Sequence, residues 1–332
     1  MKLKNSIQQY LNKHGFRQFS PKAVLFDMDG VIYDSMPNHA VSWHESMAAF
    51  GLDMPLEGAY LYEGMRGVET IKLLARKQWQ KELTDDEAAR MYAAKSQRYA
   101  ACPPARIMPG IRDVMQQIKD GGMKICVVTG SGQHVLLDKL QDDFPGLVTK
   151  ELMVTAFDVT HGKPDPEPYM IGMRKCGVKP WQTIVVENAP LGVRAAAAAH
   201  CFTIAVNSGP LPDKVLWDEG ADLVFPDMVS LSTQWASLMA MTPQKLTLSQ
   251  KERWEQNYKE LRDFIITRKQ LPSKHRKEEH DMLNWMKYNR KCIAAGKLSA
   301  ERIKKFQELM DIARPFLKVN QYAYAAKQQG KR

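Results

Sequence analysis

The sequence predicts an α/β protein: a doubly wound parallel sheet with a helical cap inserted after the first strand, followed by a small all-α domain. Three observations support this fold class. Strand-like and helix-like segments alternate from about residue 111 to residue 239, an all-helical block fills residues 37–103, and the composition changes after residue 242. Such alternation is typical of parallel sheets whose crossover helices cover both faces.

Length and composition agree with several globular domains. A chain of 332 residues exceeds one ordinary core, and its 44% hydrophobic and 25% charged residues are ordinary for globular proteins. We expect five parts. They are an N-terminal extension (1–20, a short amphipathic helix or a loose segment), a core (21–36 and 104–241), a cap (37–103), a basic three-helix domain (246–320) and a flexible tail (321–332).

Targeting signals and cysteine usage favour a cytoplasmic protein. No apolar run approaches the roughly 18 residues that a membrane span requires, so we expect no membrane contact. The basic N-terminus lacks the apolar stretch of a secretory signal. The five cysteines are scattered without a C-x-x-C pair, which favours buried free thiols in a reducing compartment over disulfides or metal ligands.

The first strand is expected at Val24–Phe26, and it ends at two carboxylates, Asp27 and Asp29. Gly30 follows, where the chain must turn. Open α/β sheets place their sites at the carboxyl ends of the strands. Two acids this close repel each other unless a cation lies between them, and oxygen ligands favour Mg²⁺. A single D-x-D-G segment could equally be an ordinary acidic turn.

The cap is expected because the pattern becomes helical after this turn. Its helices break near residues 51–55 and 64–67, and Thr84 precedes three acids as a helix N-cap does. Cys102-Pro103-Pro104 ends the block.

Further strands are expected at 124–128, 152–155, 183–186, 202–206 and 221–225. Polar residues follow two of them: Thr129-Gly130-Ser131 after the first, and Glu187-Asn188 after 183–186. Lys163 lies in a loop before a helix. Together with the acid pair they supply a nucleophile, two partners for phosphate oxygens and further metal ligands. Thr129 alone could be a turn residue and Lys163 alone a solvated lysine, but this order favours phosphoryl transfer.

These four segments resemble the motifs of the haloacid dehalogenase (HAD) phosphotransferase superfamily, over about residues 20–240. Within it the chain resembles the β-phosphoglucomutase-like group. The strings VVTGSGQ, ELMVTAFDV, GKPDPEPY and VENAPLGV resemble an inorganic pyrophosphatase branch of that group. The resemblance implies a cap that rocks over the site, with hinges at residues 31–35 and 103–108.

The resemblance and the chemistry assign roles to the core residues. Asp27 is expected to attack phosphorus and form an aspartyl phosphate. Asp29 is expected to act as general acid and then general base, with its backbone carbonyl toward the metal. Thr129 and the amides of Gly130 and Ser131 would hold the phosphoryl oxygens. Lys163 would neutralise charge in the transition state.

The expected Mg²⁺ ligands are Asp27, Asp29, Glu187 and Asn188. The superfamily usually has an acid at the position of Asn188, so the amide here lowers the negative charge of the site. Whether Asn188 binds the ion directly or through water stays open.

The cap residues expected to select the substrate are Ser35, His39, Glu63 and Arg66. Glu63 precedes Gly64 at the place where the mutases carry a lysine that helps hold a sugar phosphate. A carboxylate there suits metal-bound pyrophosphate, or activation of water, better than an anionic sugar phosphate. Arg66 could meet a distal phosphate. Glu63 could also be a solvated helix end, and His39 a hydrogen-bonded cap residue.

The C-terminal residues differ sharply in charge from the rest. Residues 246–332 hold 21 lysines and arginines against 10 acids, a net of +11, whereas residues 1–245 hold 26 against 27. Helices are expected at 249–269, 277–293 and 299–313, and their pattern resembles a helicase-associated domain. The basic surface could bind nucleic acid or simply be solvated. Trp254 and Trp285 are expected in the core.

The leading hypothesis is therefore a Mg²⁺-dependent phosphohydrolase acting on inorganic pyrophosphate. The alternatives are a β-phosphoglucomutase or sugar-phosphate phosphatase and, from another class, a nucleic-acid-binding protein with an accessory HAD domain.

Overall fold

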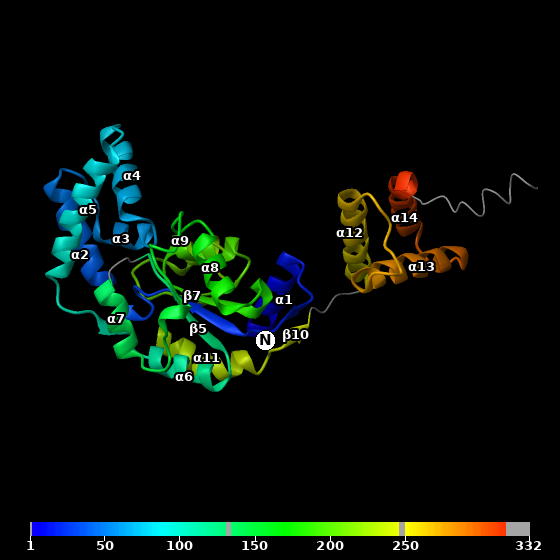
Figure 1. The fold of residues 1–332 in the computed structure, drawn as a ribbon, viewed down its shortest axis with the longest axis horizontal. Coiled ribbons are helices and arrows are strands. Elements are labelled where there is room, and N and C mark those ends of the chain that lie inside the picture. The colour runs from blue at the N-terminus through cyan, green and yellow to red at the C-terminus, as the bar shows by residue number, and fades with distance from the viewer. Residues whose placement is uncertain (1, 131–133, 246–249, 317–332) are drawn as a thin grey trace, which may run out of the picture. The chain divides into compact units, whose positions relative to one another are not determined.

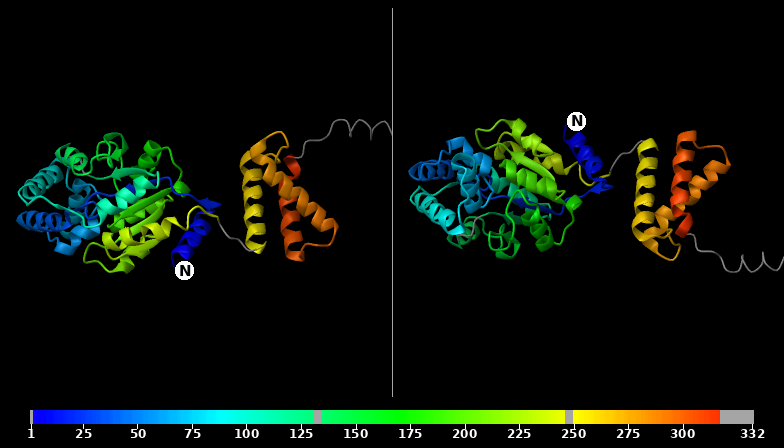
Figure 2. Two further views of the ribbon diagram at one scale, coloured as in Figure 1. Left: turned by 90° about the horizontal axis from the view of Figure 1, so that it is seen from below. Right: turned by 90° about the horizontal axis from the view of Figure 1, so that it is seen from above.

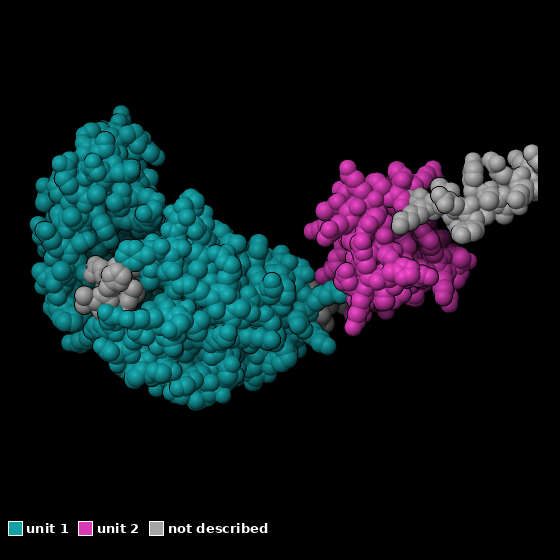
Figure 3. Space-filling model, in the orientation of Figure 1, with its two compact units in different colours: residues 1–246 teal, residues 247–332 magenta. Residues whose placement is uncertain are grey.

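The computed structural model describes residues 2–130, 134–245 and 250–316 (Figure 1). Ser131 and the expected tail 321–332 lie outside them. The chain divides into two compact units, residues 1–246 and 247–332 (Figure 3).

A six-stranded parallel sheet forms the centre of the first unit, in the order β6-β5-β2-β7-β8-β9. In the middle of the sheet, Phe26 of β2 pairs with Val127 of β5 on one side and Val186 of β7 on the other. The residues that follow these strands therefore emerge side by side. The bounds are β2 Ala23–Phe26, β5 Lys124–Val128, β6 Met153–Val154, β7 Thr183–Glu187, β8 Phe202–Val206 and β9 Leu223–Phe225.

Helices cover both faces of this sheet, as expected for a doubly wound fold (Figures 1 and 2). Alternate residues of β2 show why: Val24 and Phe26 pack into one apolar cluster, and Ala23 and Leu25 into another. Helices α6 and α11 supply residues to the first cluster, and α8 and α9 to the second. The helix bounds are α6 Ile111–Asp120, α7 His134–Asp143, α8 Glu167–Cys176, α9 Pro190–Ala198, α10 Asp213–Asp218 and α11 Met228–Met239.

The N-terminal residues are part of this core, which corrects the expectation of an extension. Helix α1 (Lys2–His14) buries Ile7, Tyr10 and Leu11 completely in the first cluster. Strand β1 (Gln18–Phe19) then pairs antiparallel with β10 (Gln244–Lys245), beyond the expected boundary at residue 241. The apolar face of α1 is short and lies in a basic sequence. The sequence alone therefore does not predict that this helix packs against the sheet.

The cap comprises helices with an apolar cluster of their own, including Trp43, Met47 and Ile71. Two short antiparallel strands, β3 (Tyr33–Asp34) and β4 (Arg106–Ile107), join it to the core inside the two segments expected as hinges. Thr84 is the N-cap of α5, as the sequence indicated, and it forms a capping box with Glu87. The cap helices are α2 Met36–Ala49, α3 Leu56–Tyr62, α4 Gly67–Trp79 and α5 Asp85–Ala100.

The second unit contains helices α12 (Gln250–Arg268), α13 (His280–Ala294) and α14 (Ala300–Ala313). Trp254 and Trp285 belong to its apolar cluster, as expected. The indole N–H of Trp254 donates to the fully buried Asn289 side chain at 2.7 Å, which satisfies a polar group inside this core.

Two further properties of the described residues are the length and hydropathy of the helices and the state of the cysteines. Within the described ranges, none of the helices is both long and apolar enough to cross a bilayer. The five cysteines are free thiols, and all except Cys102 are buried.

Candidate active site

The site begins at the carboxyl end of β2, where the chain turns sharply. Asp27 and Asp29 are nearly buried, at 6% and 9% exposure, and the N–H of Asp27 donates to the carbonyl of Val186 at 3.0 Å. Gly30 has a φ of +78°, and a Cβ there would lie 2.1 Å from the amide nitrogen of Asn188. Only glycine fits this turn, so the sequence signal D-x-D-G reflects close packing between the ends of β2 and β7.

Lys163 lies between the two acidic strand ends. Its Nζ contacts Asp27 Oδ1, and donates to Glu187 Oε1 at 2.7 Å and to the Val128 carbonyl at 3.3 Å. The side chain is only 3% exposed. Burial alone would lower the pKa of Lys163, but the carboxylates of Asp27 and Glu187 outweigh it and raise the pKa above its usual value. The ammonium therefore stays charged beside the expected nucleophile.

Two buried oxygens at this edge have no hydrogen-bond partner within the described structure: Asp27 Oδ2 and Asn188 Oδ1. Buried polar atoms are normally paired, so these two oxygens indicate a missing partner. Carboxylate and amide oxygens suit Mg²⁺, and the donor set fits that ion. Within the part of the chain that the structure describes, no three His, Cys, Asp or Glu side chains are grouped as metal ligands, so the expected site would also need Asn188 and a backbone carbonyl. Lys163 contacts both Asp27 and Glu187.

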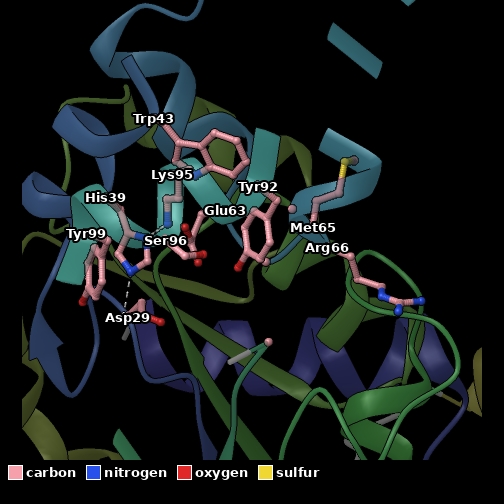
Figure 4. Close-up of a pocket in the computed structure, with 13 residues that line it drawn as sticks. Asp29, His39, Trp43, Glu63, Met65, Arg66, Tyr92, Lys95, Ser96 and Tyr99 are labelled. Carbon is pink, nitrogen blue, oxygen red and sulfur yellow. Dashed lines mark hydrogen bonds and ion pairs between the residues drawn. The ribbon is translucent and has the colours of Figure 1, made fainter. Parts of the chain in front are cut away.

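Asp29 is held from the cap side (Figure 4). Ser35 Oγ donates to Asp29 Oδ1 at 2.6 Å, and His39 Nε2 lies 3.4 Å from the same oxygen. Burial would raise the pKa of Asp29, but His39 and the hydrogen bonds from His39 and Ser35 lower it to about 2. Asp29 is thus ionised, the form that accepts a proton from water. His39 is hydrogen-bonded, as one of the two alternatives for this residue proposed, and it also lies next to Asp29.

Lys95 of α5 is a site residue that the sequence analysis missed. It is 4% exposed, and its Nζ lies 2.8 Å from His39 Nδ1. The ammonium lies 5.1 Å from the ring centroid of Tyr99 and 5.2 Å from that of Trp43. Burial lowers the pKa of Lys95, and Glu63 and Asp29 counteract it. The sequence does contain a signal for Lys95. Tyrosines lie three residues before it and four residues after it, which places all three side chains on one face of a helix.

Glu63 lines a cavity of about 80 Å³ with Asp29, His39 and Lys95. It is half-buried, and burial together with Asp29 raises its pKa, while His39, Lys95 and Lys163 counteract the rise. Glu63 thus ends α3 but is only partly solvated, and its role in substrate selection stays a prediction.

Arg66 and Gly64 lie where the cap meets the core. Arg66 is exposed and points away from the Glu63 cluster (Figure 4), and its Nη1 donates weakly to the carbonyl of Thr160 at 3.4 Å. A Cβ on Gly64 would lie 3.0 Å from Lys163 Cδ, so this cap loop rests directly on the expected catalytic lysine. Arg66 belongs to the rim of the site in this arrangement.

The remaining expected phosphate-binding residues follow β5. Thr129 is buried, its N–H donates to the carbonyl of Val154 at 2.9 Å, and Gly130 lines the same cavity as Glu63. Ser131 lies outside the described residues.

This geometry agrees with a known family. The model of the haloacid dehalogenase-like hydrolases matches residues 21–200. The chain belongs to this family. This hydrolase is 29% identical over 188 residues to hexitol phosphatase A of Escherichia coli (strain K12), a match that covers 56% of this chain and 83% of that protein. It is 27% identical over 201 residues to the beta-phosphoglucomutase of Bacillus subtilis (strain 168), over 57% of this chain and 84% of that one.

A solved structure gives a further likeness. A Bacteroides vulgatus protein, provisionally assigned as a beta-phosphoglucomutase, matches with a TM-score of 0.71 and 48% identity over 73% of this chain and 99% of that chain. The hydrolase thus belongs to the β-phosphoglucomutase-like group and is a phosphatase of the HAD type. Such enzymes depend on Mg²⁺, in agreement with the oxygen donors described above.

Proposed function

We propose that this hydrolase cleaves inorganic pyrophosphate to phosphate through an aspartyl phosphate on Asp27. The observation that carries the proposal is Glu63, a carboxylate in a cavity of about 80 Å³ that also contains Asp29. A second cavity, of about 370 Å³, also adjoins Asp29 and is lined by Ser35 and Tyr99, so the proposal depends on the charge of Glu63 and not on the size of the site.

The chemistry follows from the core residues. Asp27 attacks phosphorus, the bond to the bridging oxygen breaks, and the second phosphate leaves with that oxygen. The Lys163 ammonium offsets the charge that builds on the transferred group. Thr129 and the Gly130 amide would bind the phosphoryl oxygens. Asp29, ionised and oriented by Ser35 and His39, accepts a proton from the water that releases phosphate from Asp27.

The metal supplies positive charge and orients the phosphoryl oxygens for in-line attack. Asp27 Oδ2 and Asn188 Oδ1 are the side-chain oxygens that would hold it, with the backbone carbonyl of Asp29 as a further expected ligand.

Glu63 argues for pyrophosphate over a hexose bisphosphate. A carboxylate next to Asp29 repels a second phosphate unless that phosphate arrives with a bound cation, as pyrophosphate does in the presence of Mg²⁺. It could also orient water in the second step. Lys95 and His39 partly offset the negative charge on the cap side of the site, so the carboxyl groups of Glu63 and Asp29 can lie in the same cavity.

A sugar-phosphate phosphatase is the second candidate. The names of the relatives favour it: one is a hexitol phosphatase, and a Thermotoga maritima relative is a phosphorylated carbohydrates phosphatase. The cavity of about 370 Å³ beside Asp29 and Ser35 is large enough for a sugar. A β-phosphoglucomutase would also need a cap that excludes water and holds a second phosphate, where Glu63 is unfavourable.

A substrate comparison tests the proposal. Phosphate release should be measured with Mg²⁺ and equal concentrations of pyrophosphate, hexose 6-phosphates, hexitol phosphates and β-glucose 1-phosphate. We expect kcat/KM for pyrophosphate to exceed the others by about tenfold or more, the effect of one or two well-placed polar contacts. A sugar phosphate with the highest kcat/KM would make the second candidate correct.

For the C-terminal unit we propose binding to nucleic acid backbones, through a face of α13. Tyr288 is 63% exposed there, between the exposed Lys287 and Lys291. No aspartate or glutamate occurs from residue 282 to residue 300, so this face lacks nearby carboxylates along its own chain. An exposed aromatic ring flanked by lysines suits base stacking with phosphate contacts. The resemblance to a helicase-associated domain supports the same proposal.

A further inference from the structure

Glu187 differs from the other acids of the site because protein donors surround its carboxylate. Oε1 accepts from Lys163 Nζ and from Tyr169 OH, both at 2.7 Å. Oε2 accepts from the backbone N–H groups of Asn188 and Ala189 at 2.9 and 3.1 Å. An ionised carboxylate offers about four acceptor positions, so these contacts use all of them. Asp27 and Asn188, in contrast, each keep one unpartnered oxygen.

Tyr169 is the member of this set that no role described so far explains. It is completely buried on α8, and its ring centroid lies 5.1 Å from Lys163 Nζ. It therefore contacts both ends of the Lys163–Glu187 pair: the ring faces the ammonium and the hydroxyl donates to the carboxylate.

The fold brings Tyr169 there through two close approaches. A Cβ on Gly172, one turn along α8, would lie 2.8 Å from Leu25 Cδ2, so glycine lets α8 press against β2. A Cβ on Gly192 of α9 would lie 1.8 Å from Glu187 Oε1, so glycine also makes room for the carboxylate itself. Helix α9 thus leaves space for Glu187, and α8, packed closely against β2, supplies its fourth donor.

We propose that Tyr169 is a positioning residue for phosphoryl transfer, acting through Glu187 on Lys163. Its hydroxyl fixes the Glu187 carboxylate so that Oε1 holds the Lys163 ammonium against Asp27. Glu187 then serves as the anchor of Lys163, and Asp27 and Asn188 supply the direct side-chain ligands of Mg²⁺. The inference deepens the proposed function of this site and depends on its use of Asp27 as nucleophile.

The consequence is specific to the transition state. Without the hydroxyl, Oε1 loses one of its two donors and the Glu187 carboxylate can rotate away from Lys163. The ammonium then no longer has a fixed place beside Asp27 when negative charge is shared between Asp27 and the transferred group. Binding of Mg²⁺ and of the substrate depends on other atoms and should change little.

The test is Tyr169→Phe, which keeps the ring and removes only the hydroxyl. We expect kcat to fall about tenfold, with KM and the Mg²⁺ dissociation constant, measured by calorimetry without substrate, within about twofold of the wild type. Affinity for Mg²⁺ with fluoroaluminate, a mimic of the transferring phosphoryl group, should fall by the same factor as kcat/KM.

Tyr10→Phe is the matched control. Tyr10 is also completely buried, and its hydroxyl also donates, to the carbonyls of Pro180 and His200. It lies in the first apolar cluster, near the amino ends of β7 and β8 and not at the carboxyl ends that form the site. It should lower the melting temperature and leave kcat unchanged. Equal kcat for the two variants would overturn the inference. So would a large loss of Mg²⁺ affinity in Tyr169→Phe, since Glu187 would then be a direct ligand.

A double-mutant cycle with Lys163→Ala separates a route through Lys163 from a general loosening of the site. We expect Tyr169→Phe to reduce turnover further by less than about twofold in the Lys163→Ala background. A full tenfold loss there would contradict the route through Lys163. Turnover of p-nitrophenyl phosphate is measured in parallel, so that the variants can be compared even if pyrophosphate is not the preferred substrate. The fluoroaluminate affinity reports on the inference without turnover.

Discussion

The two halves of the active site are built in different ways. The core half consists of residues that directly follow parallel strands, and its negative charge is offset by the buried Lys163. The cap half consists of side chains from α2, α3 and α5, which meet only because those helices pack together, and its cation is Lys95. Each half therefore pairs carboxylates with one buried lysine. The difference suggests a division of labour in which the core transfers phosphoryl groups and the cap selects and aligns what is transferred.

The core half should fail completely when its nucleophile is removed. In Asp27→Asn the amide is too poor a nucleophile to form the covalent intermediate, and we expect turnover to fall by about a thousandfold or more. Circular dichroism and the melting temperature should show a folded protein. Phosphate release above a few per cent of wild type, from material of confirmed purity, would remove Asp27 from this role.

Removal of the metal should affect the same half nearly as strongly. With excess chelator we expect activity to fall by at least about a hundredfold and to return with Mg²⁺, because Asp27 and Asn188 then regain a partner for their unpaired oxygens. Ca²⁺ should inhibit, since its larger and looser shell misplaces the oxygens for in-line attack. Titration of turnover against free metal ion measures both effects. Full activity in chelator would contradict the metal assignment.

Lys95→Met tests whether the cap half contributes to chemistry as well as selection. Methionine fills a similar volume among Trp43, Tyr92 and Tyr99, but His39 loses its hydrogen-bond partner and Asp29 its alignment. We expect kcat to fall by about ten- to a hundredfold, in the range of general acid–base contributions.

The control for Lys95 is Lys72→Met, which removes a cap lysine that pairs with the exposed Asp85. Surface ion pairs contribute little, so both kcat and stability should stay close to wild type. If Lys95→Met changes only KM, the cap selects substrate and takes no part in the chemistry.

Glu63→Lys should shift selectivity rather than abolish activity. A lysine there attracts a distal sugar phosphate and repels a metal-loaded substrate, so the ratio of kcat/KM for pyrophosphate to that for hexose phosphates should fall by about tenfold. Glu57→Lys, at an exposed cap position in α3, gives the same change in net charge and should leave the ratio unaltered. Parallel losses for both substrates in Glu63→Lys would make Glu63 a structural residue.

Truncation after Thr242 should have the smallest effect on either half of the site, within about twofold in turnover, because every proposed site residue precedes the cut. The cut removes β10, which pairs with β1, so a lower melting temperature is expected. A large loss of turnover would show that the removed residues support the catalytic core.

The same truncation should abolish nucleic acid binding, whose affinity should fall steeply with salt. In the full chain, Lys287→Ala/Lys291→Ala should weaken binding to single-stranded oligonucleotides more than Lys251→Ala/Lys259→Ala, a charge-matched change on α12. Equal effects would assign the binding to net charge alone, and no retention at low salt would favour a solvated surface.

The sequence by itself determined the core half of this protein. Parallel strands all deliver their following residues to one edge, so Asp27, Thr129 and Glu187 could be grouped from their positions after apolar runs. Gly30 marked the turn that follows the first of these strands. The separate C-terminal helices and the helical cap could also be predicted from the sequence, because helical periodicity and charge are local properties of the chain.

Only the tertiary structure decided which side chains complete the site. Lys95 and Tyr169 lie inside helices. The spacing of Lys95 between two tyrosines is a weak local signal, and the roles of both residues come from contacts with His39 and Glu187, which are distant in sequence. The burial of α1 against the sheet is of the same kind. Strand ends are fixed by backbone geometry, whereas the contacts of a helix face depend on which element packs against it, and that is a property of the whole fold.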